Sequence, residues 1–291
     1  MLQQYKNYFL LHLTVFIYGF TGILGKLISL PADNLVWYRL VIAILSLLVF
    51  LLFTQRPVIA QPKDILRYAG VGFIIALHWV FFYRSIKEGS VSVAVVCLAA
   101  STFFTAIIEP LLFKRKLRVY ELLAGALIFL ALFYMFSEDN IPTAGVTEGI
   151  ISAFLAAIFP VLNGLLTKNH DPFRLTFYEL SGGLVLLSFY FLFTGEFSNN
   201  FWEVSHADWM WLLVLGIVCT AFTFVIGVKI MREISPFTVV LSINLEPVYT
   251  IILAYFIFAD AERMSLRFYS GTLLILLCIG FNAYLKKRLN K

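Results

Sequence analysis

The chain of 291 residues consists mostly of long apolar runs that are separated by short polar connections. A transmembrane α-helix needs about 20 consecutive, predominantly apolar residues, and ten runs have close to this length. We therefore predict an all-α membrane protein with ten transmembrane helices. The expected spans are Tyr8–Leu27, Leu35–Phe53, Tyr68–Ile86, Val91–Phe113, Val119–Phe136, Val146–Thr167, Leu175–Thr194, Trp209–Ile230, Phe237–Phe258 and Phe268–Leu285.

The composition supports this reading. Hydrophobic residues make up 61% of the chain and charged residues 13%, whereas soluble domains carry about 25% charged residues. The short connections leave almost nothing for a soluble domain. The three cysteines lie inside apolar runs without metal-ligand spacing. We therefore expect no metal site and no cofactor.

The basic residues predict the orientation in the membrane. If both termini are cytoplasmic, 16 of the 22 Lys and Arg residues lie on the cytoplasmic side and 6 on the other. Positive charge accumulates on the cytoplasmic side of membrane proteins, so we predict cytoplasmic N and C termini in a multi-pass protein of the cell (inner) membrane. This distribution also explains the basic pI without a nucleic-acid partner. Lipids are expected partners, and self-association stays open.

Similarities between the two halves indicate an internal repeat. Lys87, near the end of the third run, matches Arg232 near the end of the eighth at an offset of 145, and Arg39 matches Glu179 at an offset of 140. Each repeat would hold five spans. Because five is odd, the halves would enter the membrane in opposite directions, which is a common transporter design. We predict two inverted five-helix repeats, residues 1–140 and 141–291.

The ninth run places a carboxylate beside a proline in the middle of the membrane. A charge such as that of Glu246 costs at least ~2.5 kcal/mol there, so it indicates a functional group or a structural partner of another span. Pro247 removes a helix hydrogen bond and can open the backbone near Ile243. A polar stripe with four-residue spacing, which shares one helix face, could line a substrate or proton path: Thr238, Ser242, Glu246 and Thr250.

The offset of 145 places Ser101 opposite Glu246 and Thr105 opposite Thr250. Two such stripes facing each other would enclose a central cavity, although a chance match is the alternative. Glu109 breaks the match, because it falls opposite an alanine and lies beside the basic cluster 114–116. We expect Glu109 to act as a gate or to pair with Lys114 or Arg115, or else to cap the interface.

Further polar and aromatic residues inside the runs are candidates for the cavity. An intramembrane histidine such as His78 could transfer protons, or it could be a hydrogen-bonded packing residue, and Trp79 could stack on a substrate. Arg39 and Glu179 are expected to pair locally as gate residues, with a substrate carboxylate as an alternative partner for Arg39. The other cavity candidates are Tyr18, Asn163, Thr223, Ser242, Asn244 and Tyr249.

The chain resembles the drug/metabolite transporter superfamily in its EamA-like, ten-span branch. The residues that carry the resemblance are the glycines at 19, 22 and 25 followed by Lys26, the arginine of Tyr38-Arg39-Leu40, the loop serines Ser90 and Ser235, and the pair Glu262-Arg263 before Gly271. The basic cluster 114–116 departs from the pattern, because an acidic residue is expected there. The resemblance implies a cavity enclosed by spans one, three, four, six, eight and nine, with spans five and ten outside it.

The resemblance implies a secondary transporter, often an exporter of amino acids or related metabolites. We expect alternating access around a central cavity, with Glu246 and His78 as proton-coupling residues. Another small solute (a sugar, a nucleotide derivative, a quaternary amine or a drug) is the alternative. A scaffold or receptor would need an output domain that the chain lacks, and no HExxH, GxSxG or Walker motif indicates an enzyme.

Overall fold

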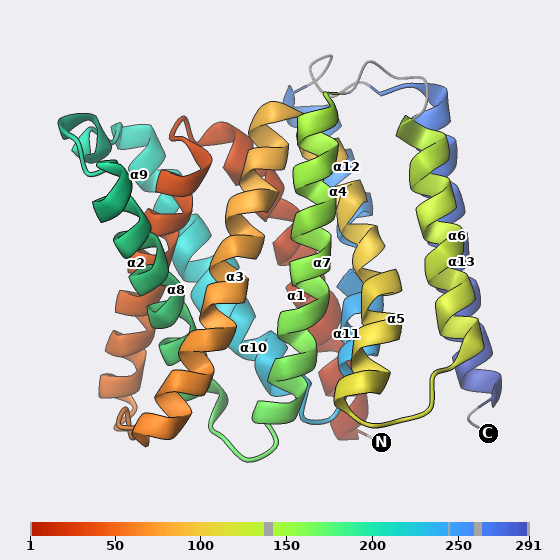
Figure 1. Ribbon diagram of the computed structural model, residues 1–291, viewed down its shortest axis with the longest axis horizontal. Helices are drawn as coiled ribbons and strands as arrows, with labels where there is room; N and C mark the ends of the chain where they lie inside the picture. Colours follow the sequence, from red (N-terminus) through yellow and green to blue (C-terminus); the bar gives the residue numbers. More distant parts are fainter. Residues whose placement is uncertain (1, 137–141, 244, 259–263, 290–291) are drawn as a thin grey trace.

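The computed structural model describes residues 2–136, 142–243, 245–258 and 264–289. Within these ranges the protein is helical and has no strand (Figure 1). The helices are α1 (Leu2–Leu27), α2 (Ala32–Phe53), α3 (Pro62–Glu88), α4 (Val91–Cys97), η1 (Leu98–Ala100), α5 (Ser101–Leu112), α6 (Val119–Phe136), α7 (Thr143–Leu166), α8 (Pro172–Thr194), η2 (Asn199–Trp202), α9 (His206–Leu213), η3 (Val214–Phe222), α10 (Thr223–Ile230), α11 (Pro236–Ile243), α12 (Glu246–Phe258) and α13 (Leu266–Leu289).

The helices agree with the predicted multi-pass membrane protein. In the part of the chain that the structure describes, eight helical segments are long and apolar enough to cross a membrane. The other two predicted spans correspond to α6 and α13, whose apolar stretches are shorter. These two helices lie side by side at one edge of the bundle (Figure 1). Gly271 permits this contact, because a Cβ atom there would lie 2.1 Å from Cγ of Met135.

Both chain termini lie at the same end of the bundle (Figure 1). The connections α2–α3, α5–α6, α7–α8 and α10–α11 lie at this end as well. The distribution of Lys and Arg residues predicted that these four connections lie on the same side of the membrane as the termini. That this end faces the cytoplasm stays a prediction.

Three of the predicted spans are interrupted. In the ninth, α11 ends at Ile243 and α12 begins at Glu246, directly before Pro247, which confirms the predicted opening of the backbone. In the eighth, the segment η3 is a nine-residue π-helix, in which the Thr220 hydroxyl donates to the Leu215 carbonyl five residues earlier, at 2.6 Å. In the fourth, the 3₁₀ turn η1 separates α4 from α5. Such interruptions are common where membrane helices line a cavity.

Glycines allow the central helices to approach closely, as small residues do between membrane helices. A Cβ atom at Gly72 of α3 would lie only 1.8 Å from the carbonyl oxygen of Glu179 in α8. A Cβ at Gly19 of α1 would lie 3.0 Å from Cβ of Tyr249, and the Thr250 hydroxyl donates to the Gly19 carbonyl at 3.0 Å. These contacts hold α3 against α8 and α1 against α12, and they position the side chains described next.

Candidate functional site

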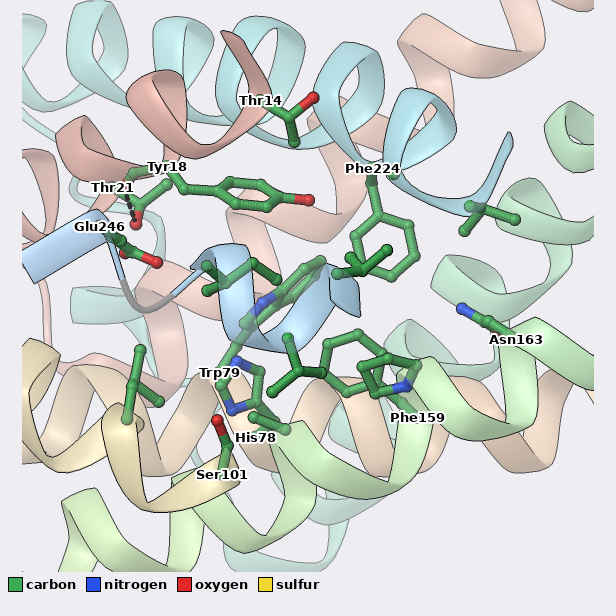
Figure 2. A pocket seen from close by; sticks show the side chains of 18 of the residues that line it. Thr14, Tyr18, Thr21, His78, Trp79, Ser101, Phe159, Asn163, Phe224 and Glu246 are labelled. Carbon is green, nitrogen blue, oxygen red and sulfur yellow. Dashed lines mark hydrogen bonds between the residues drawn. The ribbon is translucent and has the colours of Figure 1, made fainter. Parts of the chain in front are cut away.

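A pocket with a volume of about 90 Å³ lies among the central helices (Figure 2). Side chains from α1, α3, the η1–α5 segment, α7, α10 and the α11–α12 segment line it. These are the spans one, three, four, six, eight and nine that the family resemblance implied. No described residue of α6 or α13 contributes to the lining. The structure adds α2, which contributes Arg39.

Arg39 is the cationic group of this pocket, and only 2% of its surface is exposed. Its Nε donates to the Thr220 hydroxyl at 2.7 Å and its Nη1 to the Tyr83 hydroxyl at 2.9 Å. The guanidinium lies over the Trp79 ring, 3.8 Å from the ring centroid. These partners hold the guanidinium in place by hydrogen bonds and a cation–π contact, but they bring no negative charge.

Local backbone geometry explains how Arg39 comes to lie there. The π-helical η3 contains Thr220, which accepts from Arg39. Gly216 of the same segment packs directly on α2, because a Cβ at this position would lie 2.6 Å from Cγ2 of Ile42. We predicted that Arg39 pairs locally, with a substrate carboxylate as the alternative partner. The described carboxylates form no ion pair with Arg39, and its side chain reaches the pocket, so the substrate carboxylate stays a prediction.

Glu246 is the acidic residue of the pocket, and only 4% of its surface is exposed. It is the first residue of α12, directly after the interruption of span nine. The carboxylate therefore lies at a helix N-terminus, where the helix dipole stabilises a negative charge. It forms no ion pair with Arg39 or with another described base. The pocket thus contains a buried base and a buried acid that form no ion pair with each other.

An aromatic wall completes the polar end of the pocket. Trp79 contacts Phe224 edge to face at 5.8 Å, and Phe159 stacks on Phe224 at 5.9 Å. His78 is held against α7, because its Nδ1 lies 3.0 Å from the Ser152 carbonyl oxygen and 2.8 Å from the Ser152 hydroxyl. The predicted pair His78 and Trp79 therefore lines the pocket, with His78 in a defined hydrogen-bonded orientation.

Tyr18, Ser101 and Asn163 also line the pocket, from α1, α5 and α7 (Figure 2). Ser101 and Glu246, which the repeat offset placed opposite each other, lie in the same lining. Lining residues that sequence reasoning missed include Thr14, Phe159 and Phe224. For the two phenylalanines no signal was available, because 30 phenylalanines lie along this chain and only packing selects among them.

The predicted stripe along span nine does not line the pocket as a whole. The Ser242 hydroxyl donates to the Thr238 carbonyl of its own helix at 2.9 Å, and Tyr249 packs edge to face on Phe16 of α1 at 5.4 Å. Neither belongs to the lining. The interruption before Glu246 explains this result, because the four-residue spacing does not continue across it. Asn244 lies outside the described residues, as does the motif Glu262-Arg263.

Two further candidates are buried elsewhere. The Thr223 hydroxyl donates to the Cys219 carbonyl one turn earlier, at 2.8 Å, and so bonds its own helix. Thr105 is fully buried in α5, and its hydroxyl has no hydrogen-bond partner among the described residues. The helix α5 packs against α6, α7 and α11. Neither threonine lines the pocket.

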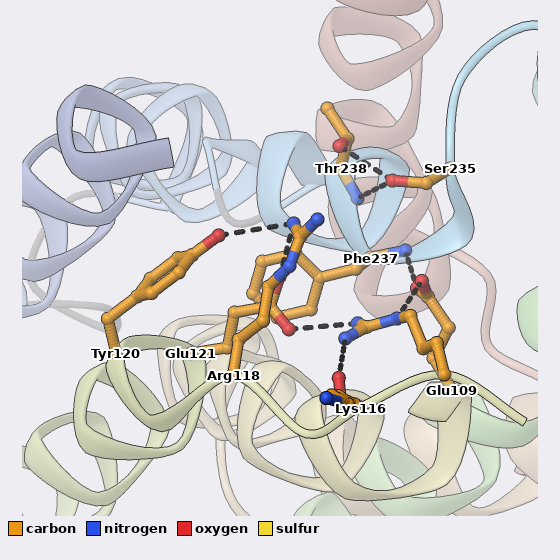
Figure 3. Close-up of polar contacts among 9 residues, drawn as sticks. Glu109, Lys116, Arg118, Tyr120, Glu121, Ser235, Phe237 and Thr238 are labelled. Carbon is orange, nitrogen blue, oxygen red and sulfur yellow. Dashed lines mark hydrogen bonds and ion pairs between the residues drawn. The ribbon is translucent and has the colours of Figure 1, made fainter. Parts of the chain in front are cut away.

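Glu109 connects two interrupted spans at the end that holds the termini (Figure 3). Its carboxylate accepts from the backbone N–H of Phe237 in the first turn of α11 at 2.6 Å, and from Nε of Arg115 at 3.2 Å. The predicted ion pair with Arg115 is therefore confirmed. Arg115 also contacts Glu121 at 2.8 Å, and Arg118 reaches the same carboxylate at 3.6 Å. Glu121 is the acidic partner of the basic cluster, and sequence reasoning missed this residue.

Glu179 was expected to pair locally; the described residues form no ion pair with it, and a role as a gate residue stays a prediction. Its side chain is fully buried and forms no ion pair with any described residue. Among the described residues its side chain forms one hydrogen bond, a long one of 3.5 Å in which the Asn163 amide donates to Oε2. The other oxygen, Oε1, has no partner in this part of the chain. Asn163 therefore lies between Glu179 and the pocket.

Comparison with known proteins gives consistent results. The profile of the EamA-like transporter family matches residues 6–137 and again residues 143–284. The uncharacterized transporter YxxF of Bacillus subtilis (strain 168) is 26% identical over 248 residues, which are 83% of this chain and 78% of that protein. An uncharacterized transporter of Archaeoglobus fulgidus is 27% identical over 232 residues, which are 80% of each chain.

The fold has also been observed by crystallography. A protein of known crystal structure superposes with a TM-score of 0.70 over 97% of this chain and 98% of its own, at 16% sequence identity. At this identity the likeness concerns the fold alone. The family matches, in contrast, cover nearly the whole chain and coincide with the helices that enclose the pocket. The chain belongs to the EamA-like transporter family, within the drug/metabolite transporter superfamily, and is a multi-pass membrane transporter.

Proposed function

We propose that this transporter exports amino acids, or closely related zwitterions, by alternating access around the central pocket. The observation that carries the proposal is the presence of Arg39 and Glu246 in one lining without an ion pair between them. A carboxylate is the natural ligand of a guanidinium, which donates two parallel hydrogen bonds. An ammonium group is the natural partner of the Glu246 carboxylate. A zwitterion with both groups neutralises both charges at once.

The size of the pocket also favours a small solute. Sites for drug-sized ligands have volumes of about 300–1,000 Å³, whereas this pocket has about 90 Å³. A nucleotide derivative or a drug would require a considerably wider pocket. The aromatic wall of Trp79, Phe159 and Phe224 could receive an apolar side chain beside the two charges.

Contacts at the two ends support the proposed inverted repeat. Lys87, near the end of α3, donates from Nζ to the Ile28 carbonyl just after α1. Its matched residue Arg232, just after α10, donates from Nε to the Thr167 carbonyl just after α7, at 2.9 Å. Each basic residue thus binds a carbonyl at a helix C-terminus, which is favourable for a cation. The two contacts lie at opposite ends of the bundle (Figure 1).

In this proposal we call these two contacts latches. The Lys87 contact belongs to the first half, residues 1–140, and the Arg232 contact to the second, residues 141–291, and they close opposite ends of the pocket. Alternating access requires that one end opens while the other is closed. Cytoplasmic termini and a location in the cell (inner) membrane follow from the distribution of basic residues. Glu246 and His78 remain candidates for coupling to a proton gradient, since both line the pocket.

The test is transport by purified protein in proteoliposomes that are loaded with a labelled amino-acid panel. We expect efflux or exchange of at least one amino acid, and competition by compounds that carry both a carboxylate and an ammonium group. The corresponding amines without a carboxylate, and acids without an amine, should compete at least tenfold less well, because each leaves one buried charge without a partner. Equal competition by amines would contradict the proposal.

A further inference from the structure

A second group of buried polar atoms lies next to the pocket, between α3, α7 and α8. Four atoms in this region have no hydrogen-bond partner among the described residues: Oε1 of Glu179, Oδ1 of Asn163, Oγ1 of Thr176 and the hydroxyl of Tyr68. All four side chains are fully buried. Buried polar groups are nearly always paired with protein or water, so four unpaired ones in one region indicate a place where a small ligand or water binds.

The positions of these residues follow from the packing of the helices. Thr176 precedes Glu179 by three residues in α8, so the two side chains share a face. Asn163 of α7 donates to Glu179, and the ring of Tyr68 of α3 lies 6.3 Å from the ring of Tyr178, the residue before Glu179. The close contact at Gly72 presses α3 onto the backbone of Glu179. Lipid and bulk water are therefore excluded from the carboxyl in this conformation.

Arg174 of α8 donates from Nη1 to the Ile59 carbonyl at 3.2 Å, and neither it nor the described charged residues of the helices packed on α8 form an ion pair with Glu179. On α3, Asp64 and Arg67 pair with each other at 3.6 Å. On α2, Arg39 binds Thr220 and Tyr83, and on α10 Lys229 is exposed to the surroundings. No described base forms an ion pair with Glu179. An ionised carboxylate is unfavourable in such a place, because no base beside it offsets the loss of hydration.

We propose that Glu179, rather than Glu246 or His78, is the proton-binding site of the transporter and that Asn163 links it to the substrate pocket. In the conformation described here the carboxyl holds the proton. Asn163 lines the pocket and also donates to Glu179, so a substrate that binds the Asn163 amide competes with this hydrogen bond. Glu179 lies two helical turns into α8 from the end that holds the termini. Opening of that end would admit water and let the proton leave.

This inference rests on the proposed transport function but is tested separately from it. The first experiment is infrared spectroscopy of the purified protein over a range of pH, without any substrate. The carbonyl stretch of a protonated carboxylic acid is the signal. We expect a band that Glu179→Gln removes and Glu246→Gln retains, and that Asn163→Ala shifts because the hydrogen bond to Oε2 is lost.

The second experiment uses proteoliposomes and the amino acid that the panel identifies. Glu179→Gln imitates the protonated carboxyl, so it should retain exchange of labelled against unlabelled amino acid. In the wild type, a pH gradient should drive accumulation of about tenfold per pH unit for one coupled proton. In Glu179→Gln the ratio of the amino-acid concentrations across the membrane should fall to one. The exposed Glu203→Gln is the matched control and should behave as the wild type. Unfolding temperatures of all variants check that they fold.

The outcomes separate the two proposals. An infrared band that persists in Glu179→Gln would overturn the assignment of the proton to Glu179, whatever is transported. Accumulation that follows a Na⁺ gradient and ignores the pH gradient would overturn it as well. If no amino acid moves but the band depends on Glu179, the proton site stands and the proposed substrate class fails.

Discussion

Arg39 of α2 and Glu246 of α12 line the same buried pocket and form no ion pair with each other. Each charge is held by its own surroundings. Hydrogen bonds to Thr220 and Tyr83 and the ring of Trp79 fix the guanidinium, and the start of α12 holds the carboxylate. The separation between the two charges is the feature on which the proposed recognition of zwitterions depends.

Replacing Arg39 should weaken the binding of the carboxylate group specifically. Arg39→Lys keeps the positive charge but cannot donate to Thr220, Tyr83 and a substrate carboxylate with the same planar geometry. We expect at least a tenfold loss of apparent affinity for the transported amino acid in exchange assays. Arg67→Lys, at an exposed position of α3, is the control. An unchanged affinity in Arg39→Lys would contradict the role of this residue.

The close crossing of α3 and α8 should be sensitive to a single methyl group. Gly72→Ala would place a Cβ atom 1.8 Å from the Glu179 carbonyl oxygen, so the helices must separate. Overpacking of this kind costs about 1–3 kcal/mol, and the unfolding temperature in detergent should fall. Gly70→Ala, two residues earlier in the same helix, meets nothing within 4 Å. This control should be neutral or slightly stabilising, and equal destabilisation by both variants would contradict the packing argument.

The two matched latches should have opposite effects when they are removed. We expect Lys87→Met to favour opening at the end that lies away from the termini, and Arg232→Met to favour opening at the end that holds them. A single cysteine introduced as Ser101→Cys in a background without native cysteines reports the access of a membrane-impermeant maleimide to the pocket. Labelling should increase from opposite sides of the membrane in the two variants.

Lys168→Met is the control for this experiment, because Lys168 is exposed and lies at the same end as Arg232. If both latch variants increase labelling from the same side, the latches do not alternate. The proposed relation between the two halves would then fail.

Glu109 should determine the stability of the first turn of α11. Glu109→Ala removes the acceptor of the Phe237 N–H and one carboxylate partner of Arg115. Loss of a helix cap costs about 0.5–2 kcal/mol, so hydrogen exchange should accelerate in the first turn of α11. Glu233→Ala, at an exposed loop position nearby, should leave the exchange rates unchanged. Equal exchange in Glu109→Ala and the wild type would show that the cap is not needed.

The sequence alone determined the membrane character, the approximate positions of the helices and several pocket residues. Length and apolarity suffice for the spans, because a chain in lipid must satisfy its backbone hydrogen bonds within helices. A charge such as Glu246, or a histidine such as His78, is expensive within a span, and such residues therefore point to the interior. Pro247 marked the interruption of span nine for an equally local reason, since it lacks an N–H group.

Only the tertiary structure decided which polar groups meet. In the sequence, Arg39 is a residue near the end of a span. Its side chain reaches the pocket because Thr220 of the π-helical segment accepts from it and because Gly216 of that segment packs directly on α2. The regular spacing of Ser242 and Glu246 predicted a common face, which the interruption between α11 and α12 removes. Glu179 matched Arg39 in the repeat yet forms no ion pair with a described base. The spacing of residues along a helix predicts which side chains share a face of that helix. Which group a buried charged side chain contacts depends on how the neighbouring helices pack against it.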